Sequence, residues 1–527
     1  MQPTQIFELV IAMFLAVIAL HYLAHRIGLP PSAALMAGGG LLAFVPGLPA
    51  ITVDPSLVLT IFLPPLLMDG AWSIAISPLR RHLFGVLSLA VGAVLFTCAL
   101  VAFVTHLLFP SLPWAACALL GAIVSPPDAV SARAVLERVK LPQRLQILLE
   151  GESLLNDASG LVLFRFAVAA SITGMFSIVD AAGSFLLLAF GGALVGAAVG
   201  LVWVKIVRRL GDEYIIIVGT ALISWTSYIL AEFLHLSGVI ATVTAAVIAS
   251  WNQYTVLSAS NRVRGGSFWT VMVFLMEAAV FILIGLSLRG VIERAGGFGV
   301  VAATMTWPIL AILGTLILAR FAWVFGSDGV IRLLNALGMR KYGPLGARAA
   351  TVVGWAGVRG VVTLALALSV PEGIPGRDFI LVASFSVIAG TLLIQGMTLG
   401  RVIEWAQLKE VDSHLPRLNL NQAEAAMAKV QLETMTRLAY DAEGKLIHPM
   451  LLDQFQRRAG AIARLAERTE ELRPQLHAHF DTLLVVVAAG RKELLRLHRD
   501  GDIDDDTLHE LERDLDLEEL IAISNKA

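Results

Sequence analysis

Residues 150–160, EGESLLNDASG, place several polar groups beside a long apolar segment. In a helix, Ser153 and Asp157 lie four residues apart on one face, while Glu152 and Asn156 form a second pair on the adjacent face. Carboxylate and hydroxyl oxygens are hard ligands that suit an alkali cation, and a carboxylate can also take a proton. The stretch therefore predicts one site that holds either a cation or a proton at Asp157.

A second polar stretch, SPPDAV at 125–130, interrupts an apolar helix expected over 114–133. Pro126 and Pro127 remove two backbone donors and disfavour helical conformation in the residues before them. Asp128 then begins the next half-helix, where free N–H groups favour a carboxylate. Lipid cannot satisfy the freed carbonyls, so we expect the break to line a cavity that holds water or a cation. The alternative is a kinked structural helix with a capping aspartate.

A third stretch, GWAGVRGVVTLALALSV at 354–370, surrounds Arg359 with Gly354, Gly357 and Gly360. Interrupted helices at corresponding positions of two halves are typical of inverted-repeat transporters, which bind their cargo between the two interruptions. We expect Arg359 to place positive charge near the crossing of the two broken helices. A helix with purely structural glycine packing does not account for the arginine.

Further ionisable residues fall within apolar stretches, where such a group is costly and marks an ion pathway or a partner charge. Asp69 follows LPPLLM, and Glu277 lies in FLMEAAVFILIGL. Arg320 lies near the middle of an apolar run and requires a carboxylate, for which Glu152 is the predicted partner. Arg165 is expected nearer the outer end of its helix, where it could extend to the headgroups, and is given no role.

The elements that position these residues are membrane helices. The chain has 527 residues, of which 57% are hydrophobic and 15% charged, a balance far from that of soluble globular domains. Apolar stretches of about 18 residues recur as far as residue 403, and closed barrels are excluded because their spans are shorter and alternate in polarity. We predict about thirteen helices. They lie at 6–24, 31–47, 55–72, 83–109, 114–133, 142–170, 181–206, 214–233, 236–250, 267–289, 298–326, 346–369 and 378–403.

Basic residues in the connections determine the predicted orientation. Most of them fall on one side of the membrane: Arg26, Arg80, Arg81, Arg133, Arg138, Lys140, Arg144, Lys205, Arg208, Arg209, Arg262, Arg264, Arg332, Arg340, Lys341 and Arg348. The other side has Arg289, Arg294 and Arg377. By the positive-inside rule the N-terminus is outside and the C-terminus cytoplasmic. We therefore expect a transmembrane domain over 1–403 and, because the composition becomes strongly charged, a cytoplasmic helical regulatory tail over 404–527.

Six stretches in this order resemble the electroneutral sodium/proton antiporters of the cation:proton antiporter superfamily, in the branch of bacterial antiporters and sodium/hydrogen exchangers. They are LPPLLMDGA at 63–71, SPPDAV at 125–130, GESLLNDASG at 151–160, EAAVFILIGL at 277–286, the lone Arg320 and GVRG at 357–360. The resemblance covers helices three to thirteen. It implies an all-α membrane fold with inverted repeats and two broken, crossing helices. It also implies a homodimer in the cell (inner) membrane, surrounded by lipid, in which a core domain moves against a dimerisation domain.

The resemblance assigns roles to the polar residues one by one. Asp157 matches the carboxylate that binds cation and proton alternately, and Asn156 matches the residue that stabilises the helix crossing. Asp128 matches the acid of the first broken helix and Ser153 a side-chain ligand, so Na⁺ is expected at Asp157, Asp128 and Ser153. Asp69 matches an acidic residue near the cytoplasmic approach to the site.

Glu152 and Arg320 match a buried ion pair that holds the core together, in agreement with the pairing expected from burial. Glu277 is a secondary candidate for the site. Two departures from the family pattern matter. Many members read Thr-Asp-Pro or Val-Asp-Pro where this chain reads Pro-Asp-Ala at 127–129, so only the backbone carbonyl of Pro127 can contribute a ligand there. Asp69 is also shorter than the glutamate often found at its position.

The resemblance implies exchange of Na⁺ for H⁺ by alternating access. Asparagine at 156, where electrogenic relatives carry a second aspartate, implies one proton per cation. The sequence leaves Na⁺, Li⁺ and K⁺ open as substrates, and the alternatives are a K⁺/H⁺ antiporter or a proton-independent cation channel. A hydrolase with Ser153 as nucleophile is disfavoured, because no histidine lies at a matching depth and the GxSxG pattern is absent. We expect no enzymatic activity, no cofactor and no nucleic-acid partner.

Overall fold

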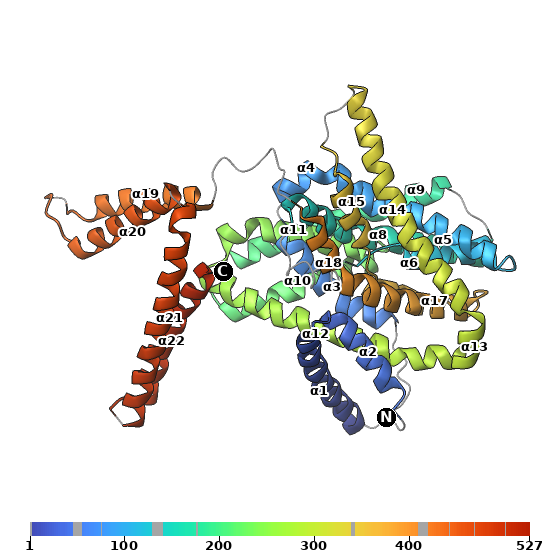
Figure 1. Cartoon of the computed structure of the whole chain (residues 1–527), viewed down its shortest axis with the longest axis horizontal. Coiled ribbons are helices and arrows are strands. Elements are labelled where there is room, and N and C mark those ends of the chain that lie inside the picture. The colour runs from blue at the N-terminus through green and yellow to red at the C-terminus, as the bar shows by residue number, and fades with distance from the viewer. Residues whose placement is uncertain are drawn as a thin grey trace. The chain divides into compact units, whose positions relative to one another are not determined.

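A computed structural model describes residues 3–45, 55–74, 76–128, 141–174, 178–338, 343–408, 420–441, 443–467, 469–500 and 502–526 (Figure 1). These residues are helical apart from turns, short connections and one isolated bridge between Tyr440 and Leu446. The chain divides into two compact units, Met1–Val411 and Asp412–Ala527. The predicted all-helical class is therefore confirmed for the described part of the chain.

The first unit contains the apolar helices. They are α1 (Pro3–Ile27), α2 (Pro31–Ala43), α3 (Pro55–Ser73), α4 (Ile76–Leu87), η1 (Ser88–Ala93), α5 (Val94–Leu108), α6 (Trp114–Val124), α8 (Gln143–Thr173), α9 (Ile178–Val207), α10 (Glu213–Phe233), α11 (Gly238–Val256), α12 (Ala259–Arg294), α13 (Phe298–Thr304), α14 (Thr306–Ala336), α15 (Ala347–Trp355), α16 (Val361–Leu368), α17 (Arg377–Gly390), η2 (Thr391–Gly396) and α18 (Met397–Ala406). Within the described residues, seven helices are long and apolar enough to cross a membrane.

The predicted helices coincide with these elements, and the differences lie at interruptions. The helix predicted over 298–326 is divided into α13 and α14 at Met305. The helix predicted over 346–369 is divided into α15 and α16 by the non-helical residues 356–360. The fifth predicted helix ends early, with α6 stopping at Val124, and residues 129–133 lie outside the described part.

Apart from the short α13, the helices of the first unit form two groups that pack more extensively within themselves than with each other. We call α4, η1, α5, α6, α8 and α14–α18 with η2 the crossing bundle, and α1–α3 with α9–α12 the flanking bundle. In the crossing bundle, α6 packs against α5, α8 and α16. In the flanking bundle, α11 packs against α9, α10 and α3, while α12 packs against α2.

Small residues allow helices α2 and α12 of the flanking bundle to approach each other closely. A Cβ atom on Gly39 would lie 2.5 Å from the carbonyl oxygen of Ile282, and one on Gly285 would lie 2.4 Å from the backbone nitrogen of Gly40. Such close backbone approach is the usual way in which membrane helices gain packing energy without a hydrophobic driving force. Helices α2 and α12 are therefore held together by backbone contact.

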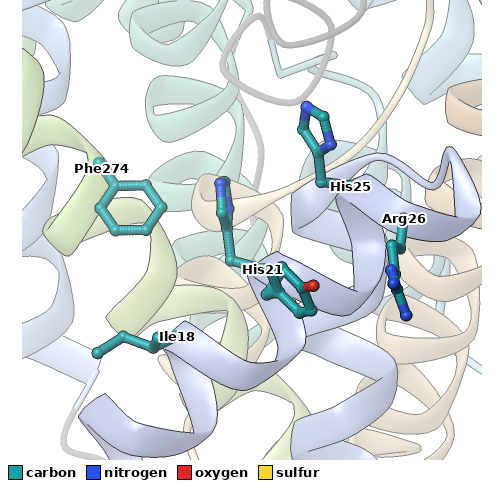
Figure 2. Close-up of a pocket in the computed structure, with 6 residues that line it drawn as sticks. Ile18, His21, His25, Arg26 and Phe274 are labelled. Atoms are coloured by element: carbon teal, nitrogen blue, oxygen red, sulfur yellow. The ribbon is translucent and has the colours of Figure 1, made fainter.

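A shallow hollow lies on the surface where α1 faces α12 (Figure 2). Its lining consists of Ile18, His21, Tyr22, His25, Arg26 and Phe274. The ring of His21 packs edge-on against the ring of Phe274, with 4.9 Å between the ring centroids, and the Arg26 guanidinium lies over the Tyr22 ring. None of the predicted ion-site residues lines this hollow.

The second unit consists of two helix pairs. Helix α19 (Leu420–Leu438) packs against α20 (Pro449–Glu467), and α21 (Thr469–Arg499) packs along α22 (Asp505–Lys526). Arg491 on α21 lies 2.6 Å from Asp516 and 2.7 Å from Glu519 on α22, so charge pairs join the two helices. The regulatory role expected for this part of the chain stays a prediction.

Candidate functional site: the helix crossing

The first helix break follows α6, whose helical hydrogen bonds stop at Val124. Two hydrogen bonds from distant elements hold the irregular backbone that follows. The Asn156 side-chain amide on α8 donates to the carbonyl of Pro127 at 2.5 Å. The backbone N–H of Asp128 donates to the carbonyl of Val358 at 2.7 Å. The two predicted breaks thus meet and are joined by a backbone hydrogen bond.

The second break, between α15 and α16, contains a glycine that the crossing requires. A Cβ atom on Gly360 would lie 1.7 Å from Oδ2 of Asp128, which is far inside van der Waals contact. The Asp128 carboxylate therefore lies against the backbone of the second break. Any larger residue at 360 would have to displace this carboxylate or the backbone beside it.

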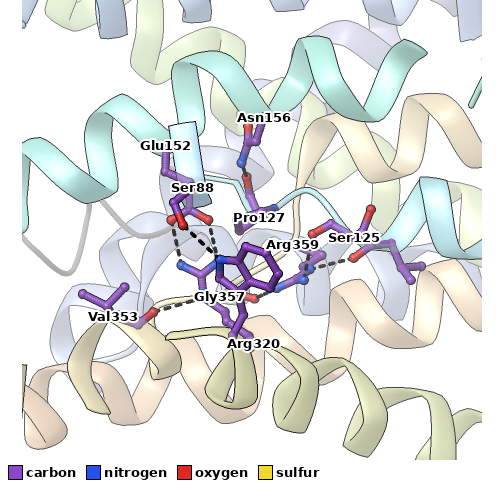
Figure 3. A network of polar contacts seen from close by, with 11 residues as sticks. Ser88, Ser125, Pro127, Glu152, Asn156, Arg320, Val353, Gly357 and Arg359 are labelled. Atoms are coloured by element: carbon purple, nitrogen blue, oxygen red, sulfur yellow. Dashed lines mark hydrogen bonds and ion pairs between the residues drawn. The ribbon is translucent and has the colours of Figure 1, made fainter. Parts of the chain in front are cut away.

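Arg359 is buried at the crossing, as its position between the glycines predicted. Its Nε donates to the carbonyl of Val124 at 2.8 Å, its Nη2 to that of Ser125 at 3.0 Å, and its Nη1 to that of Gly357. Val124 and Ser125 form the C-terminal end of α6, where the helix dipole is negative. The guanidinium therefore satisfies carbonyls that the first break leaves without helical partners (Figure 3).

Helix α8 carries the Asn-Asp pair past the crossing. Asn156 is 0% exposed and Asp157 is 7% exposed. A Cβ atom on Gly160 would lie 2.5 Å from Cγ of Pro126, so α8 passes in direct contact with the first break. The Asp157 and Asp128 carboxylates are near enough to act on each other electrostatically. The structure thus brings together two acids and the carbonyl of Pro127.

Ser153 lies one helical turn before Asp157 and is partly buried on the same face of α8. This is the arrangement that the spacing of the two residues predicted. Next to it, the Oδ1 atom of Asn156 is buried and accepts no hydrogen bond among the described residues. Oxygen atoms from a hydroxyl, an amide and two carboxylates are therefore carried by a short stretch of α8 and the adjacent break.

Glu152 and Arg320 form the predicted pair. Arg320 Nη1 lies 2.6 Å from Oε1 and Nη2 lies 2.8 Å from Oε2 of Glu152, with the two side chains 3% and 2% exposed. Arg320 Nε also donates to the carbonyl of Val353 at 3.0 Å, so the pair connects α8, α14 and α15. Both side chains therefore lie inside the protein, away from its surface. Glu150, by contrast, is partly exposed and accepts a bond from Gln146 at 2.8 Å.

Asp69 and Glu277 lie in the other helix group. Asp69 is on α3 and Glu277 on α12, both partly buried and both in contact with other groups of the chain. Both helices belong to the flanking bundle. Their roles in the ion path stay predictions.

Two residues that the sequence did not single out support this region. The Thr391 hydroxyl accepts a bond from the backbone N–H of Arg359 at 3.1 Å. Thr391 begins η2, a π-helical turn, and such turns are frequent at functional sites. Glu232 on α10 lies 2.8 Å from Nη2 of Arg165, so that arginine is paired and does not merely extend to the headgroups. An arginine in an apolar run was the signal that predicted a carboxylate partner for Arg320, and the same signal at Arg165 could have predicted one there.

The donor set fits a transported alkali ion. Within the described residues, no three histidine, cysteine or acidic side chains gather as a metal site. Hard oxygen atoms around Asp157 instead provide the ligand type that alkali cations accept.

Comparison with known proteins gives matches along most of the chain. Residues 10–405 match the family described as "Sodium/hydrogen exchanger, transmembrane". A protein of Mycobacterium tuberculosis named an uncharacterized Na⁺/H⁺ exchanger is 30% identical, over 97% of this chain and 95% of its own. The sodium, potassium, lithium and rubidium/H⁺ antiporter of Bacillus pumilus is 30% identical, over 98% of this chain and 78% of its own.

A solved structure shares the fold. The sodium proton antiporter MjNhaP1 from Methanocaldococcus jannaschii superimposes with a TM-score of 0.58, at 21% sequence identity, over 76% of this chain and 98% of that one. At this identity the likeness concerns the arrangement of helices.

Proposed function

Since the chain belongs to the sodium/hydrogen exchanger family, we propose that it exchanges Na⁺ for H⁺ at Asp157 by alternating access. The observation that carries the assignment of the site is the buried Asp157 carboxylate beside the crossing of two interrupted helices. Asp128 and Ser153 assist as ligands, together with the carbonyl of Pro127. That carbonyl accepts a bond from Asn156 and keeps a second lone pair for an ion.

Competition at one carboxylate couples the two ions. Asp157 and Asp128 repel each other when both are ionised, because like charges at short distance raise each other's energy. A sodium ion between them removes the repulsion, and so does a proton on Asp157. Either cargo can occupy the site, but a protonated Asp157 is a poor cation ligand, so binding of one displaces the other.

The fixed charges at the crossing support a one-for-one exchange. Two carboxylates, Asp157 and Asp128, and one guanidinium, that of Arg359, belong to the crossing, while Glu152 and Arg320 form a separate ion pair. The empty site therefore carries one net negative charge, and one Na⁺ or one H⁺ makes it neutral. Both loaded forms have the same charge, and the empty form is the costly one to move through a low-dielectric region. This charge balance supports the one-proton-per-cation exchange that the resemblance implies.

Alternating access requires the ligands to move as a unit. The Glu152–Arg320 pair connects α8, α14 and α15, and Arg359 ties the second break to the end of α6. The ligand-bearing residues therefore belong to one connected group of helices. We propose that the crossing bundle moves against the flanking bundle and opens Asp157 to each side in turn.

The organisation of the whole chain belongs to the same proposal. Helices α4–α5, the first break and α8 correspond to α14, the second break and α17–α18 as inverted repeats within thirteen crossings. The basic connections support an outside N-terminus, a cytoplasmic C-terminus and a regulatory role for the tail. We further propose a homodimer in the cell (inner) membrane, with no cofactor and no enzymatic activity.

Purified protein in liposomes loaded with a pH-sensitive dye tests the exchange. Addition of Na⁺, and separately of Li⁺ and K⁺, should change the internal pH, and Asp157→Asn should reduce the change to that of protein-free liposomes. Glu150→Gln, which removes a partly exposed carboxylate two turns away on α8, should exchange at the unmodified rate. A cation-driven pH change that persists in Asp157→Asn would contradict the assigned site.

The same liposomes distinguish exchange from the alternatives. If exchange is electroneutral, the initial rate should not respond to a potential imposed with K⁺ and valinomycin, with Na⁺ as the driving ion. Cation flux without a pH change would indicate a channel. A response to K⁺ alone would indicate a K⁺/H⁺ antiporter.

A further inference from the structure

Arg165 and Glu232 form an ion pair that the exchange mechanism does not use. Arg165 is on α8, eight residues beyond Asp157, which places it about 12 Å further along the helix axis. Its Nη2 atom lies 2.8 Å from Oε2 of Glu232, in the last turn of α10. The pair therefore sits on the far side of the ion site from Glu150.

The pair joins the two helix groups. Most side-chain hydrogen bonds stay inside one bundle: Trp72 to Gln253 and Trp225 to the carbonyl of Ile61 in the flanking bundle, and Trp355 to Thr398 in the crossing bundle. Arg165 to Glu232 instead connects α8, which carries the ion site, with α10. Helix α8 otherwise packs only lightly on the flanking bundle, through α3, α9 and α11.

Glu232 is held in place on its own side. Its Oε1 atom accepts the backbone N–H of Gly238 at 3.3 Å, at the start of α11, where the helix dipole favours a carboxylate. Tyr228, one turn earlier on α10, is buried and its ring lies against Gly238. The Glu232 carboxylate is thus held in a fixed position on the flanking bundle, where Arg165 of α8 can bind it.

Burial distinguishes this pair from the one beside the ion site. The Arg165 and Glu232 side chains are 39% and 30% exposed, whereas those of Arg320 and Glu152 are almost fully buried. An ion pair that is not fully enclosed by the protein contributes less to stability and opens at lower cost than a buried one. Breaking a buried pair leaves an unpaired charge and is far more costly. Of these two pairs, the exposed one is the better suited to open and close within a transport cycle.

We propose that Arg165 and Glu232 form a latch that closes the outer side of the site and must open whenever Asp157 faces outside. The proposal rests on the exchange function and orientation given above, in which α8 and α10 both run outward to these residues. Closing the latch stabilises the state that faces the cytoplasm. Loss of either partner therefore shifts the population toward the state that faces outside.

A cross-link tests whether the two residues lie on parts that move apart. Arg165→Cys with Glu232→Cys, in a chain whose buried Cys98 and Cys117 are replaced by alanine, is treated with a short bismaleimide. The matched control is Arg264→Cys with Glu213→Cys, an ion pair of the same 2.8 Å length that lies inside the flanking bundle. We expect the cross-link to stop exchange in the first variant and to leave the second at its uncross-linked rate.

Three results would overturn the latch. They are exchange that continues in the cross-linked Arg165→Cys, Glu232→Cys protein, equal inhibition of the control, and equal inhibition by a maleimide that reacts at one end only. Asp157→Asn tests the exchange function separately. If the cross-linked protein exchanges at the normal rate, the latch is therefore contradicted, but the exchange function is not.

Transport kinetics in right-side-out vesicles provide a second test that does not depend on labelling. Arg165→Gln and Glu232→Gln should each lower the KM for outside Na⁺ by about two- to five-fold, because more of the protein faces outside before Na⁺ binds. The exchanged pair, Arg165→Glu with Glu232→Arg, should restore the KM, and Arg264→Gln should not change it. The proposal would be overturned if the single variants had the same KM as the Arg264→Gln control, or if the exchanged pair did not restore the KM of the unmodified protein.

Discussion

The two helix breaks meet at one crossing but are built from opposite chemistry. The first, at 125–128, uses two prolines that remove backbone donors, and it ends in an acid. The second, at 356–360, uses glycines that leave room for close contact, and it carries an arginine. Proline makes its break by local geometry, whereas glycine only permits one.

Each break supplies what the other lacks. The first leaves carbonyls at Val124 and Ser125 without helical partners, and Arg359 from the second donates to both. The second leaves the carbonyl of Val358 free, and it accepts the N–H of Asp128 from the first. Within a membrane neither break is satisfied alone, because lipid offers no hydrogen bonds. The crossing is therefore one structural unit made by two dissimilar segments.

The largest expected effect comes from removing the arginine of the second break. Arg359→Met keeps most of the side-chain volume but leaves three buried carbonyls without donors, at about 1–3 kcal/mol each, so we expect a loss of about 3–5 kcal/mol or more in stability. The Tm and the monodisperse fraction in detergent should both fall sharply, and Arg359→Lys should recover part of the loss. Arg289→Met, which breaks a partly exposed pair with Glu293, is the control and should change little. A Tm for Arg359→Met equal to that of the control would show that the first break is stable without its partner.

A smaller effect on stability, but a large one on exchange, is expected at the closest contact of the two breaks. In Gly360→Ala the new Cβ must displace the Asp128 carboxylate, and misplacing an active group by about 1 Å costs roughly 100-fold. We expect the Na⁺-driven pH change to slow by about 10- to 100-fold, with the protein still folded. Gly314→Ala on α14, where a Cβ meets open space, should exchange at the normal rate. Normal exchange in Gly360→Ala would mean that Asp128 need not keep its place.

The smallest effect is expected at the prolines themselves. In Pro127→Ala the carbonyl at 127 can still accept from Asn156, and Asp128 can still donate to Val358, so the break should persist. The Tm should correspond to a loss of no more than about 1 kcal/mol. Asn156→Ala, which removes the tertiary hydrogen bond but keeps both prolines, should cost more. The reverse order of the two variants would show that proline alone holds the first break.

Much of this arrangement was predictable because a charged residue in an otherwise apolar membrane segment is easily recognised in the sequence and requires a partner. An arginine in an apolar run demanded a carboxylate, and Glu152 is the partner that Arg320 has in the structure. The same reasoning did not predict Glu232 as the partner of Arg165, because Glu232 lies near a helix end, where a charged side chain can reach the headgroups and needs no partner. Nor did any pattern indicate Thr391, since a threonine in an apolar helix ordinarily bonds within its own helix.

By itself the sequence determined the apolar lengths of the helices, the places where two of them break, and the polar groups that could not remain alone in lipid. Those features follow from local chemistry: proline lacks a donor, glycine lacks a side chain, and a charge resists burial. The tertiary structure decided which groups satisfy one another, namely Arg359 with the end of α6, Asp128 with the backbone of the second break, and Arg165 with Glu232. A polar group in an apolar segment indicates only that it needs a partner, and the sequence offers several candidates. The packing of distant helices determines which of them becomes the partner.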